Sequence, residues 1–65
     1  MNELDVLYEA LYALDCGKLN EAYGLLDLCY SSYADMACDE LLKGEPESAA
    51  IAAAMVRSAI EDLEG

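Results

Sequence analysis

Residues 25–42 read LLDLCYSSYADMACDELL, and these eighteen residues combine two cysteines, two tyrosines, one methionine and four acidic side chains. At about 100° per residue, the stretch separates into two faces of one helix. The apolar face holds Leu25, Leu26, Cys29, Tyr30, Tyr33, Met36 and Leu41, and the polar face holds Asp27, Ser31, Asp35, Cys38 and Asp39. We interpret the stretch as the middle of one long helix over residues 20–43 and not as a joint cysteine site, because its two cysteines would point in opposite directions.

Shorter helices are expected on both sides, over about residues 3–16 and 46–63. The first has leucines at 3-4-3 spacing, which places four of them on one stripe. The last has a mostly alanine inner face, which lets its backbone lie close to its neighbours. The residues expected to start helices are Asn2, Asn20 and Pro46, and those expected to end them are Gly17 and Gly44.

These helices predict an all-α fold and a single small domain over residues 1–65. Connections of about four and about two residues make sequential helices antiparallel, which gives an up-down-up three-helix bundle. Helix 20–43 would be about 36 Å long and helix 3–16 about 21 Å, so part of the longer helix should overhang. An overhanging apolar face favours a homodimer formed through helical faces.

The charge of the chain restricts its partners. Three basic and fourteen acidic residues give a formal net charge of −11. Nucleic acids and anionic membranes attract Lys and Arg, so neither is expected to bind directly. A basic protein surface is the partner that this charge favours. The alternative is that the acidity serves only to keep the protein dissolved.

The compartment follows from the cysteines and from the apolar runs. The longest apolar run, Ala49–Val56, is far shorter than the ~20 residues that cross a bilayer, and the acidic N-terminus is unlike a signal peptide. Three cysteines cannot all pair within one chain. We therefore expect a cytoplasmic protein with reduced thiols.

The residue types present disfavour catalysis and metal binding. The chain has no histidine, so its serines and cysteines lack the usual base, and no Cys-x2-Cys pair suggests zinc. Its carboxylates fall mostly on outer helix faces, where a solvated role is expected. We predict no catalytic residue, no metal and no cofactor, and a metal-dependent hydrolase is the remote alternative.

One segment resembles a known helical turn. Residues 10–26, ALYALDCGKLNEAYGLL, have Gly17, Leu19 and Ala22 at the spacing of a tetratricopeptide repeat turn. The resemblance implies a tight helical hairpin in which the glycine permits the turn and the alanine permits close packing. No second repeat follows, so it implies no peptide-binding array.

The sequence finally indicates two sets of contact residues. The acidic set for a basic partner is Asp5, Glu9, Asp27, Asp35, Asp39 and Glu61, and the set for an oligomer or partner contact is Tyr30, Tyr33, Leu28, Leu42, Ile51 and Met55. In length and charge the chain resembles small inhibitors from phages and mobile elements, including anti-CRISPR proteins. That resemblance implies an inhibitor that occupies a nucleic-acid-binding surface of another protein. The alternative is a self-associating bundle, or an adaptor or chaperone subunit of a helical complex.

Overall fold

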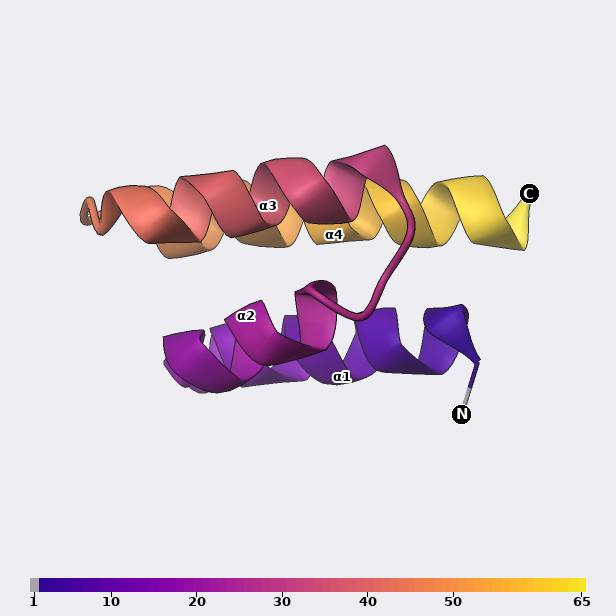
Figure 1. The fold of residues 1–65 in the computed structure, drawn as a ribbon, viewed down its shortest axis with the longest axis horizontal. Coiled ribbons are helices and arrows are strands. Elements are labelled where there is room, and N and C mark those ends of the chain that lie inside the picture. The colour runs from indigo at the N-terminus through magenta and orange to yellow at the C-terminus, as the bar shows by residue number, and fades with distance from the viewer. Residues whose placement is uncertain (1) are drawn as a thin grey trace.

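The computed structural model describes residues 2–65, which form four helices and no strand. These are α1 (Glu3–Asp15), α2 (Leu19–Leu26), α3 (Ser32–Lys43) and α4 (Ser48–Glu64). Helices α1 and α2 form one antiparallel hairpin, and α3 and α4 form a second hairpin stacked upon it (Figure 1). Within the stack, α1 contacts α4 and α2 contacts α3, so α1 and α3 lie diagonally. The all-α prediction is confirmed, and the predicted count of three helices is wrong.

The predicted helix over residues 20–43 is interrupted between Leu26 and Ser32. The amides of Leu28 and Cys29 donate to carbonyls three residues back, at 3.1 and 3.0 Å, which tightens the end of α2. The chain then extends through Ser31, whose hydroxyl accepts the Tyr33 N–H at 3.2 Å and caps α3. The Ser31 N–H in turn donates to Glu3 Oε2 at 3.2 Å, which ties the break to the start of α1.

This interruption lets a single chain bury both halves of the apolar face that the sequence places on one rod. An unbroken helix of about 36 Å would exceed the longest extent of the domain, which is 31 Å. Before the break, α2 buries Ala22 and Leu26. After it, α3 runs in the opposite direction and buries Ala34 and Ala37. The overhanging segment from which we expected dimerisation is therefore absent.

The ends of the helices test the start and end residues that we predicted from the sequence. Asn2 caps α1 as predicted, because its Oδ1 accepts the Asp5 N–H at 2.9 Å. Gly17 and Gly44 adopt left-handed backbone with φ of 77° and 65°, as expected of glycines that end helices. Two predicted starts are wrong: α2 begins at Leu19 without a side-chain cap, so Asn20 lies inside it, and Pro46 lies in the turn before α4.

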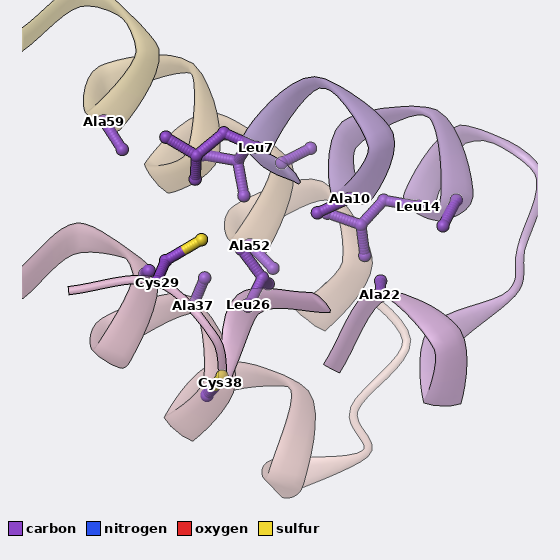
Figure 2. Close-up of a cluster of buried hydrophobic side chains, with 14 of the residues drawn as sticks. Leu7, Ala10, Leu14, Ala22, Leu26, Cys29, Ala37, Cys38, Ala52 and Ala59 are labelled. Atoms are coloured by element: carbon purple, nitrogen blue, oxygen red, sulfur yellow. The ribbon is translucent and has the colours of Figure 1, made fainter. Parts of the chain in front are cut away.

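The core between the hairpins is built largely from small side chains. Fifteen hydrophobic residues are buried, and eight of them are alanine (Figure 2). The largest fully buried apolar side chains are Leu7, Leu26 and Val56. Alanine lets helix backbones approach closely but removes little apolar area from water. Each large core residue therefore carries an unusual share of the stability of this small domain.

Candidate protein-binding surfaces

The six acidic residues that we predicted to share a partner-binding face are all exposed, but they do not form one face. Asp5 and Glu9 lie on the outer side of α1, and Glu61 lies in the last turn of α4. The remaining three are Asp27 at the end of α2 and Asp35 and Asp39 on α3, and they lie close enough to the Cys38 thiol to raise its pKa. Because α1 and α3 are diagonal in the bundle, a flat partner could not contact the carboxylates of α1 and those of α3 at once.

An open groove of about 460 Å³ runs along the outer side of α1, and we call it the α1 groove. Its lining residues are Asp5, Tyr8, Glu9 and Tyr12. Residues four apart on a helix lie one above the other, so the two carboxylates and the two rings form adjacent rows. Tyr8 and Tyr12 are 46% and 70% exposed, so a partner can reach both side chains.

A hydrogen bond joins this groove to the other end of the chain. The Tyr8 hydroxyl donates to Glu64 Oε2 at 2.7 Å, and 56 residues separate the two partners in the sequence. The bond fixes the Tyr8 ring and brings a third carboxylate to the edge of the groove. Our predicted contact set omitted Tyr8, Tyr12 and Glu64. The interleaved i, i+4 pairs of α1 were visible in the sequence, whereas the approach of Glu64 was not.

Both groove tyrosines remain neutral at ordinary pH. The hydrogen bond from Tyr8 to the Glu64 carboxylate, together with some desolvation, raises the pKa of Tyr8 above its usual value. A side-chain hydrogen bond with Cys16 is the main cause that raises the pKa of Tyr12. The negative charge of the groove therefore comes from its carboxylates alone, and its rings keep their apolar faces.

Positive charge is concentrated away from the ends of the chain. Lys18 lies in the α1–α2 turn and Lys43 ends α3, and Figure 1 shows both turns at the same end of the bundle. Arg57, the third basic residue, lines a shallow groove between α1 and α4 together with Asp15. Within residues 2–65, the end of the bundle that holds the start of α1 and the end of α4 therefore carries no Lys or Arg.

The last turn of α4 adds unfavourable negative charge at that end. Glu61, Asp62 and Glu64 all lie there, and the turn contains no basic residue. The C-terminus of a helix carries partial negative charge and is stabilised by cations, so three carboxylates at this position oppose the helix dipole. Local charge placement that costs stability is expected at functional surfaces more than elsewhere.

The cysteines occupy positions that differ from the sequence-based interpretation. Cys29 and Cys38 are both buried, so the predicted outward orientation of Cys38 is wrong (Figure 2). The break after α2 causes this, because α3 no longer continues the α2 axis and turns Cys38 towards the Tyr23 carbonyl, 3.9 Å from its sulfur. Burial is the main cause that raises the pKa of each buried thiol, and nearby carboxylates raise it further. Cys16 is exposed.

The predicted apolar contact residues are scattered. Leu28 and Leu42 are each 68% exposed, but one lies in the turn before α3 and the other in its last turn. The predicted helix over residues 20–43 would have carried both leucines, and because it is interrupted they lie on separate segments. Tyr30 is almost fully exposed in the connection between the hairpins, and Tyr33 packs partly against the core.

The other two predicted apolar contact residues, Ile51 and Met55, lie on α4. Ile51 is exposed and Met55 is half-buried against the core. Met36, which we expected on the apolar face, is 47% exposed. All three residues lie on the paired helices α3 and α4.

No sign of a metal site or a membrane segment was found in the part of the chain that the structure describes. Across residues 2–65, no group of three or more His, Cys, Asp and Glu side chains is arranged to hold a metal ion. None of the four described helices has the length and apolarity needed to cross a membrane. No family model, curated protein or solved structure matches this chain.

Proposed function

We propose that this chain is a non-catalytic acidic module that binds a basic surface of another protein. The observation that carries the proposal is the charge of −11 combined with an end of the bundle that lacks Lys and Arg within residues 2–65. Such a surface attracts a basic partner over a distance of about 10 Å at ordinary salt. Nucleic-acid-binding proteins present surfaces of this kind, so an inhibitor that occupies one is the specific form of the proposal.

The chemistry of the side chains supports a non-catalytic role. The chain has no histidine to act as a base, and two of its three thiols are buried with a raised pKa. A nucleophilic thiol needs the opposite environment, with positive charge that lowers its pKa. Binding through the exposed carboxylates requires no histidine base, and it requires no thiol to ionise or react.

The test of this proposal is a pull-down from nuclease-treated extract of the native host, eluted with increasing salt. We expect a basic protein that is released between about 0.1 M and about 0.5 M NaCl, because screening weakens contacts between exposed charges. A double-stranded oligonucleotide should compete for the same protein if the module covers a nucleic-acid-binding surface. Capture that salt does not weaken, or no specific capture, would contradict the proposal.

A second candidate function is self-association, as part of a helical assembly. The observation that favours it is the exposure of large apolar side chains on the α3–α4 hairpin, namely Met36, Leu42 and Ile51. Screening should promote such a dimer by reducing repulsion between two highly acidic chains. Sedimentation equilibrium at low and high salt tests it. A monomer at every concentration and salt would eliminate this candidate.

A further inference from the structure

We propose that the α1 groove is the docking site for a basic helical segment of the partner, with an arginine side chain seated between Tyr8 and Tyr12. The inference rests on the proposed function and names the surface that performs it. It depends on the composition of the groove, on the fixed position of one of its rings, and on the charges of the competing surfaces.

The groove contains the groups that a guanidinium recognises. Asp5 and Glu9 offer acceptor oxygens one helical turn apart, and a planar guanidinium has donors on two edges that suit carboxylates. Tyr8 and Tyr12 lie beside them at the same spacing, and their rings attract a cation placed over the face. Since both hydroxyls stay protonated, the rings interact with the cation as neutral aromatic faces.

Part of the groove is already ordered before any partner binds. The 2.7 Å hydrogen bond from Tyr8 to Glu64 holds the ring against the end of α4. A side chain held in this way loses less conformational freedom on binding than a free one. The same bond places the Glu64 carboxylate beside the groove, where it adds to the attraction for a positive segment.

The other surfaces fit this occupant less well. Three of the six residues that line the groove between α1 and α4 are alanine, and the groove already contains Arg57, which would repel a basic segment. The acidic group near Cys38, formed by Asp27, Asp35 and Asp39, lies on the α2–α3 side of the bundle, where no two tyrosines lie on the same helix. A second copy of this chain would bring another acidic surface to the groove, so charge complementarity selects a basic partner.

The experiment measures binding of a labelled, alanine-based helical peptide with four arginines on one face by fluorescence anisotropy at low salt. Two double variants remove the same charge from different places. D5N/E9Q alters the α1 groove, and E45Q/E47Q alters the α3–α4 turn near Lys43. We expect D5N/E9Q to weaken binding by about fivefold to tenfold and E45Q/E47Q by less than about twofold, because only the first removes direct ion pairs.

A second matched pair tests the rings. Tyr12→Ala should weaken binding by about threefold to fivefold through loss of the cation–π contact. Tyr12→Phe keeps the ring and removes only the hydroxyl, so it should leave binding within about twofold of the wild type. Circular dichroism melts of all four variants show whether each remains folded before affinities are compared.

Equal weakening by the two charge variants, or by the two tyrosine variants, would overturn the docking site while leaving an acidic binding module intact. The docking site would also be overturned if a peptide with its arginines spread around all faces binds as tightly as the one-faced peptide. The proposed function itself fails separately, when the native host yields no salt-sensitive basic partner. The two results are therefore distinguishable.

Discussion

Replacement of Ser31 by alanine tests whether the helix predicted over residues 20–43 is interrupted between α2 and α3. In the structure, the Ser31 hydroxyl accepts the Tyr33 N–H at 3.2 Å and caps α3. Loss of such a cap costs about 1 kcal/mol. For a domain of this size, that loss lowers the melting temperature by about 4 to 8 °C. Thermal unfolding followed by circular dichroism at 222 nm measures the change.

The same substitution has the opposite effect if the helix is continuous. Ser31 would then be an interior helix residue, and alanine would stabilise it by about half a kcal/mol through its higher helix propensity. Ser32→Ala is the matched control, because Ser32 is the exposed first residue of α3 and caps nothing. A Ser31→Ala protein that melts at the same or a higher temperature than the wild type would refute the reasoning.

Three further predictions concern the core and its thiols. Leu26→Ala should destabilise the domain by about 3 kcal/mol, because Leu26 is fully buried and leaves a cavity, whereas Leu28→Ala should change urea unfolding by less than about 0.5 kcal/mol. In the native protein, a chromogenic disulfide reagent should react rapidly with Cys16 alone. Cys29 and Cys38 should react only as fast as the domain unfolds locally and exposes them. Three thiols that react equally fast would be inconsistent with this core. Folding raises the pKa of both buried thiols, so the stability they contribute is present below the ordinary thiol pKa and is lost as pH rises through the folded value. The urea midpoint should therefore fall as the pH rises above the ordinary thiol pKa of about 9, and the fall should be smaller in C29A/C38A.

Much of the architecture was predictable from local patterns. The leucine stripe of α1, the cap at Asn2 and the glycines at positions 17 and 44 each depend on residues close in sequence. The break at Ser31 was not predictable in this way. Its apolar neighbours keep a helical period across the break, so periodicity favours continuity. What favours the break is the tertiary packing of both hairpins, together with the contact between Ser31 and Glu3.

The candidate site also combines features that local sequence patterns predict with features that depend on tertiary contacts. The exposure of Asp5 and Glu9 follows from the helical period of α1, and the structure agrees with it. The groove beside them depends on the i, i+4 tyrosines, which the sequence contained but which we did not place in the contact set. The position of Glu64 against Tyr8 depends on a contact across 56 residues, and no local pattern contains that information.

Mapping of amide shifts in a ¹⁵N–¹H titration with the one-faced arginine peptide tests the central claim most directly. The account predicts that the amides that move lie in residues 5–12 of α1 and 61–64 of α4, and that higher salt reverses the shifts. Shifts that are spread over all acidic residues, or that centre on residues 27–39, would contradict it.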